Sequence, residues 1–151
     1  MRRFAGVLLL AALAFFAACS RGPRVEILAP DGSHRATVRV EVADDRRSRE
    51  VGLMYRQHLD SDAGMLFVFA APSHQSFWMK NTVIPLDLLF ADSSLRIVGI
   101  IANAEPYSEA FLSVPADSQY VLEVNGGFCK DHGIQVHDRL EFAGFPPRSR
   151  D

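Results

Sequence analysis

FWMKNTVIPLDLLF, residues 77–90, is the most informative stretch of the chain, because it places polar side chains inside an otherwise apolar run. These side chains are the triplet Lys80-Asn81-Thr82 and the single carboxylate Asp87. A polar group in an apolar setting costs free energy unless it has a partner. The stretch therefore predicts buried β structure that contains either paired polar groups or a binding site.

The first half of this stretch suggests a ligand-binding surface. If residues 77–82 are extended, the period of two puts Trp78, Lys80 and Thr82 on one face and Asn81 on the other. An indole beside an ammonium group combines apolar area with a directed charge, which suits a planar, sugar-like or anionic ligand. Alternatively, Lys80 only neutralises a buried carboxylate, while Asn81 and Thr82 hold the following bend.

Two carboxylates, Asp87 and Glu123, interrupt segments that otherwise resemble buried strands. If both face one pocket, they are able to act as general acid and base or to bracket a cation. Each is equally able to pair with Lys80, Arg49 or Arg56 and thereby fix the strand register. The sequence leaves these alternatives open.

Apolar patterning along the rest of the chain predicts short strands. MLFVF, residues 65–69, suits a strand buried on both faces, and short helices are expected within 46–56 and 128–132. We therefore expect a mainly β fold, a compact single-domain barrel or sandwich of about seven or eight strands with two short helices. The predicted strands are 25–28, 37–42, 65–69, 77–79, 86–90, 96–102, 119–124 and 136–142.

The N-terminus is typical of an exported lipoprotein. Residues 1–18 combine two early arginines with an apolar or small stretch, as a signal peptide does, and this stretch is shorter than the roughly 20 apolar residues of a transmembrane helix. Cys19 resembles the acylated cysteine of a bacterial lipobox, which predicts a lipidated tether over 19–24 and the membrane as a partner. Ser20 after the cysteine favours the outer membrane, with the protein facing the periplasm.

The remaining sequence predicts one β domain over residues 25–142 and a flexible tail over 143–151. The net charge of −2, with both signs mixed along the chain, gives no nucleic-acid footprint. Cys129 is expected to be a buried apolar filler, since lipidation would consume Cys19. The five histidines are scattered and no nucleophile or phosphate-loop motif occurs, so we predict neither a metal nor a cofactor.

The chain resembles the bacterial and archaeal family catalogued as domain of unknown function 192. The resemblance spans about Val38 to Phe142, and Trp-Met-Lys-Asn-Thr is its most specific motif. It implies a mainly β, barrel-like or sandwich fold, often exported or lipid-anchored, with no established biochemical activity. His137 departs from the family, which usually has glycine there. The matching positions are Arg49, Gly52-Leu53-Met54, Arg56, Gly64-Met65-Leu66-Phe67, Phe69, Phe77–Thr82, Pro85-Leu86-Asp87, Phe90, Pro106, Val121-Leu122-Glu123 and Gly127.

Three functional hypotheses follow. The first is a binding module for a polar envelope ligand, a glycan or a small anionic molecule. The second is an envelope hydrolase that uses Asp87 and Glu123 in one cleft, and the third is an assembly or scaffold protein. We favour the binding module. Its expected ligand-binding residues are Trp78, Lys80, Asn81, Thr82, Asp87 and Glu123.

Overall fold

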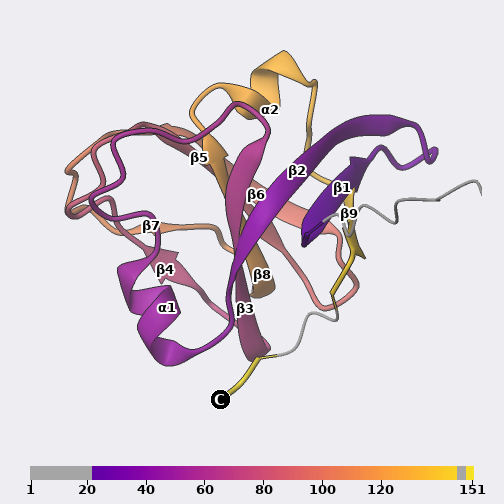
Figure 1. Cartoon of the computed structure of the whole chain (residues 1–151). Helices are drawn as coiled ribbons and strands as arrows, with labels where there is room; N and C mark the ends of the chain where they lie inside the picture. The colour runs from indigo at the N-terminus through magenta and orange to yellow at the C-terminus, as the bar shows by residue number, and fades with distance from the viewer. Residues whose placement is uncertain (1–21, 146–148) are drawn as a thin grey trace, which may run out of the picture.

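A computed structural model describes residues 22–145 and 149–151, so the predicted signal peptide and Cys19 lie outside the described residues. One curled sheet has the order β6-β5-β8-β3-β2-β1-β9, and β4 and β7 form a second, small sheet (Figure 1). The described elements are β1 (Arg24–Leu28), β2 (His34–Ala43), α1 (Arg46–Val51), β3 (Ala63–Ser73), β4 (Ser76–Phe77), β5 (Leu86–Ala91), β6 (Ile97–Ala104), β7 (Leu112–Ser113), β8 (Ser118–Asn125), α2 (Phe128–Asp131) and β9 (Arg139–Ala143). The predicted mainly β fold with two short helices is confirmed.

The large sheet curls until its two edge strands meet at one end. Every neighbouring pair is antiparallel except β2 and β3, which run parallel. At the meeting point the Ile97 amide donates to the Asp138 carbonyl at 2.8 Å, and the Leu140 amide donates to the Leu95 carbonyl at 2.8 Å. These bonds satisfy backbone groups that the edges of an open sheet would leave unpaired.

The two faces of β3, β5 and β8 are both buried. In β3, Leu66 and Val68 pack into a cluster on the concave face, whereas Met65 and Phe67 pack into a second cluster on the convex face. This alternation is the period of two of a strand, and it confirms burial on both sides for residues 65–68, whereas Phe69 at the end of the run is only partly buried. Cys129 belongs to the first cluster, and burial together with the charge of Asp87 raises the pKa of its thiol.

The strand predicted at 77–79 ends earlier, and the condition that residues 77–82 are extended is not met. Strand β4 ends at Phe77, and the Thr82 amide then donates to the Met79 carbonyl at 3.0 Å across a turn. Asn81 has a φ of 57°, a left-handed conformation that asparagine tolerates better than most residues. Strand alternation therefore does not decide where Trp78, Lys80 and Thr82 point.

The predicted short helix within 46–56 is confirmed as α1. It ends at Val51 because Gly52 leaves the helical region with a φ of 50°. Over residues 22–145 and 149–151, none of the helices is long and apolar enough to span a bilayer.

A candidate binding pocket beneath helix α1

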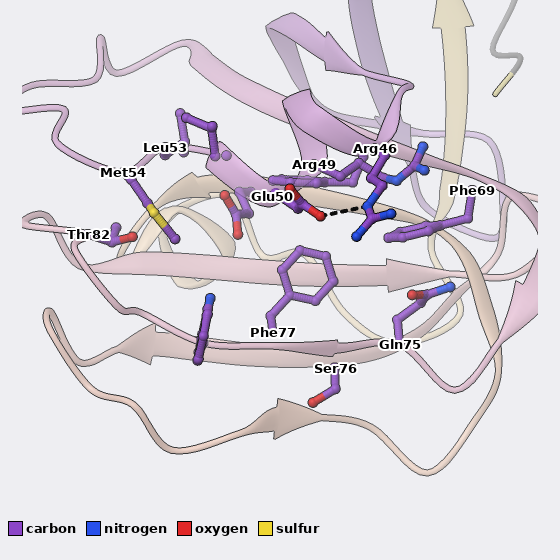
Figure 2. A pocket seen from close by; sticks show the side chains of 15 residues that line it. Arg46, Arg49, Glu50, Leu53, Met54, Phe69, Gln75, Ser76, Phe77 and Thr82 are labelled. Atoms are coloured by element: carbon purple, nitrogen blue, oxygen red, sulfur yellow. Dashed lines mark hydrogen bonds and ion pairs between the residues drawn. The ribbon is translucent and has the colours of Figure 1, made fainter. Parts of the chain in front are cut away.

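A pocket of about 610 Å³ lies between α1 and the convex face of the large sheet (Figure 2). The side chain of Asp45 accepts the Ser48 amide at 2.9 Å, and this cap fixes the start of the helix. Helix α1 and the segment after it form one wall, while β4 and the turn after it form another. Strands β3 and β8 and the connection before β4 supply the remaining lining.

Aromatic rings hold the apolar side of the pocket in place. The ring of Phe77 lies edge-on to three others, with centroid distances of 5.0 Å to Phe67, 6.4 Å to Phe69 and 5.9 Å to Phe90. Figure 2 shows Phe77 and Phe69 facing the side chains that α1 contributes. Edge-to-face contacts of this kind stabilise a fixed ring arrangement, so this wall is preformed.

Glu123 is the buried acidic group of the pocket. It lies on β8 and on the convex face, lines the pocket, and is only 5% exposed. Within the described residues its carboxyl has neither a hydrogen-bond donor nor a cationic partner. Burial raises its pKa to about 8, so at neutral pH the group is a carboxylic acid. It then offers one O–H donor and one carbonyl acceptor to the pocket.

Asp87 lies on the opposite face of the same sheet. In the register of β5 and β8, Asp87 is level with Val124 and Glu123 is level with Leu88, so the two carboxylates point to opposite sides. Asp87 is fully buried. Its oxygens accept the backbone amides of Asn103 at 2.8 Å, Gly127 at 3.0 Å and Cys129 at 2.8 Å.

This placement separates the roles of the two acids. Asp87 ties the turn before α2 and the end of β6 to β5, which is a structural function. Since Asp87 and Glu123 do not face one cleft, the geometry that the hydrolase hypothesis required of them is not present. Lys80, Arg49 and Arg56 pair with neither acid.

The turn after β4 brings some of the predicted site residues to the pocket. Trp78 and Thr82 line it together with Glu123, whereas Lys80 does not. The Lys80 ammonium lies 5.1 Å from the centre of the Trp78 ring and 3.7 Å from a carboxylate oxygen of Glu109. The predicted adjacency of indole and ammonium is therefore present, although it lies at the edge of the pocket.

The other polar residues of the triplet serve the turn itself. The side-chain amide of Asn81 approaches the sulfur of Met54 at 3.9 Å. The hydroxyl of Thr82 donates to the Lys80 carbonyl at 3.4 Å, and its side chain is buried. Of the two, only Thr82 has a group that a ligand in the pocket would contact.

Sequence reasoning missed the contribution of α1. Arg46, Arg49 and Glu50 line the pocket, and Arg46 pairs with Glu50 one turn later at 2.8 Å. Arg49 donates to the Val68 carbonyl at 2.9 Å, pairs with Asp151, and lies 5.2 Å from the centre of the Phe69 ring. The acidic cap predicted the helix, but no local signal predicted that it would pack over β3.

The described residues hold no cluster of three or more His, Cys, Asp or Glu side chains suited to a metal ion. The lining of the pocket offers a ligand aromatic rings, two hydroxyl groups, one side-chain amide, the charged groups of α1 and one buried carboxyl. Apolar and polar groups thus share the lining, and a concave site in which a few polar groups converge beside aromatic rings is typical of small-molecule sites.

The comparisons with known proteins point to one family. The family DUF192, described as "Uncharacterized ACR", matches residues 27–142. A solved structure from Sinorhizobium meliloti 1021, described as a "putative transcription regulator", is 43% identical with a TM-score of 0.77, covering 82% of this chain and 95% of that one. A protein of unknown function from Novosphingobium aromaticivorans DSM 12444 is 37% identical with a TM-score of 0.74, covering 78% and 83%. No curated protein matches the chain.

Proposed function

The chain belongs to the DUF192 family, whose description assigns no activity, and we propose that it is a binding module for a polar envelope ligand. The ligand occupies the pocket beneath α1. The observation that carries this proposal is Glu123, a carboxyl group that is 5% exposed, lines the pocket and has no partner among the described residues. The carboxyl opens onto the pocket, so a ligand there can hydrogen-bond to it in place of pocket solvent.

A glycan unit fits this pocket better than an anionic molecule. The acid form of Glu123 donates to and accepts from a sugar hydroxyl, and the aromatic wall suits the apolar face of a sugar ring. An anion would need a cation inside the pocket. Arg49, the least exposed arginine there, already pairs with Asp151 and the Val68 carbonyl.

Titration calorimetry with N-acetylglucosamine, glucose, glucuronate and phosphate tests the proposal. We expect saturable heats with the neutral sugars, and their loss in Glu123→Leu, which removes the donor and the acceptor but keeps the bulk. Glu141→Leu, on the exposed face of β9, is the matched control and should bind normally. Absence of saturable heat with all four compounds would contradict the proposal.

We also propose that the protein is exported and anchored through lipid on Cys19, in the outer membrane and facing the periplasm. The support is the composition of residues 1–24. In a bacterium with two membranes, we expect the protein in the outer-membrane fraction with a mass increased by acyl chains, and Cys19→Ala in the soluble periplasmic fraction. Intact-protein mass spectrometry checks this, and an unmodified cysteine on a chain that retains residues 1–18 would contradict it.

The scaffold hypothesis gains no support from the surface. It required an exposed apolar patch away from Lys80. Most of the large exposed apolar side chains instead belong to the segments around the Lys80 turn, namely Val51, Tyr55, Trp78, Tyr107 and Phe111, with Val136 elsewhere.

A further inference from the structure

Three loops meet beside the pocket and are joined by backbone hydrogen bonds. The Tyr55 amide donates to the Asn81 carbonyl at 2.8 Å, and the Tyr107 amide donates to the Thr82 carbonyl at 3.0 Å. All three of Tyr55, Asn81 and Tyr107 have left-handed backbone conformations, with φ of 64°, 57° and 63°. Non-glycine residues in the left-handed region cost conformational energy. The surrounding contacts must offset this cost, so the three loops have a defined conformation where they meet.

These loops expose four aromatic side chains, which we call the aromatic platform: Tyr55, Trp78, Tyr107 and Phe111, exposed by 68%, 41%, 63% and 79%. The rings of Trp78 and Phe111 are nearly parallel, with an interplanar angle of 8° and centroids 6.5 Å apart. Trp78 also lines the pocket, so the platform is continuous with it.

Charged groups are interleaved with the platform. Lys80 lies over the Trp78 ring and pairs with Glu109, and both charged side chains are substantially exposed. Protein interfaces are depleted of charge at their centre, and the Lys80–Glu109 pair has no net positive charge with which to attract the anionic headgroups of a membrane. Exposed parallel rings with the hydrogen-bonding groups of Lys80 and Glu109 beside them instead match a chain of sugar rings, which have apolar faces and polar edges.

We propose that the aromatic platform binds successive rings of a linear glycan whose terminal unit occupies the pocket. This inference rests on the proposed function and extends it from one sugar unit to a chain. Trp78 is the residue at which pocket and platform join, because it contributes to both. Phe111 does not line the pocket, and its ring is stacked with that of Trp78 and otherwise largely exposed.

Affinity as a function of chain length tests this inference. Calorimetry compares glucose and N-acetylglucosamine with their β-1,4-linked dimers to hexamers. We expect the tetramers to bind at least about tenfold more tightly than the monomers. In Phe111→Ala this gain should fall to less than about threefold, while monomer affinity stays within about twofold of the unmodified protein. The fold is not at risk, because the Phe111 side chain is 79% exposed.

Val136→Ala is the matched control, since Val136 is an exposed apolar side chain outside the platform. It should leave both affinities unchanged. Equal affinity for monomer and tetramer, or an undiminished length effect in Phe111→Ala, would overturn the inference while leaving the pocket proposal intact. If the unmodified protein binds no monomer at all, the proposed function itself is overturned, and this inference with it.

Discussion

Replacing Glu123 with glutamine is expected to stabilise the folded protein by about 3 kcal/mol at pH 7. Burial raises the pKa of Glu123 from 4.5 to about 8. Between these values the unfolded chain ionises its carboxyl but the folded chain does not, so the folded state loses about 1.4 kcal/mol per pH unit. The amide of glutamine keeps a donor and an acceptor in the same place and cannot ionise.

The sign of this effect fixes its pH profile. Below pH 4.5, Glu123 does not lower the stability of the unmodified protein. As the pH rises above 4.5 the stability falls, and it levels off above the folded pKa of about 8. The advantage of Glu123→Gln should therefore be near zero at pH 4 and reach about 5 kcal/mol at pH 9. Urea unfolding followed by circular dichroism at several pH values measures it.

Glu41→Gln is the control with the opposite sign. The hydrogen bond from Arg56 lowers the pKa of Glu41, so its charge stabilises the folded state above the unfolded pKa and that stability is lost in acid. Because Glu41 is largely exposed, the change should be small and destabilising at pH 7. A Glu123→Gln difference that is flat with pH would show that Glu123 is ionised in the folded protein, contrary to our account.

Asp87→Asn is expected to destabilise the protein by about 3 kcal/mol or more. The two oxygens of Asp87 accept three backbone amides in the interior, from Asn103, Gly127 and Cys129. An asparagine replaces one oxygen with an NH₂ group, which has no lone pair to offer. At least one buried amide then loses its acceptor and faces another donor, a loss that the interior does not compensate.

Asp92→Asn provides a matched comparison. Asp92 also accepts backbone amides, from Ser94 at 2.8 Å and Arg96 at 3.0 Å, but in a turn open to water. Water replaces the lost bonds there, so the expected cost is about 1 kcal/mol or less. Urea unfolding at pH 7 compares the two variants. Equal losses of unfolding free energy in the two variants would mean that the buried hydrogen bonds to Asp87 stabilise the fold no more than the exposed ones to Asp92.

The β architecture was predictable because the strands bury their side chains with a clear period. The apolar run at residues 65–69 and the segments around Asp87 and Glu123 all form central strands. The side of the sheet toward which each of the two acids points was not predictable. Each interrupts a strand buried on both sides, and only the pairing of β5 with β8 shows that Asp87 faces one core and Glu123 the other.

The site was predictable only in part, for a similar reason. Thr82 reaches the pocket, but a left-handed turn at Asn81, not strand alternation, positions the residues after β4. Lys80 meets an exposed carboxylate from a distant loop, Glu109, which no local pattern indicates. The helix wall depends on how α1 packs against β3, a tertiary contact that follows from the whole fold.

The central claim is that Glu123 is a protonated, buried acid that lines the pocket. Carbon-13 NMR of the glutamate side-chain carboxyl, assigned by comparison with Glu123→Gln, reports its ionisation directly as the pH is raised. Our account predicts a midpoint for Glu123 near pH 8, far above the ordinary glutamate value of 4.5. A midpoint near 4.5 would contradict it, because a carboxyl group that ionises there is either solvated or paired with a cation.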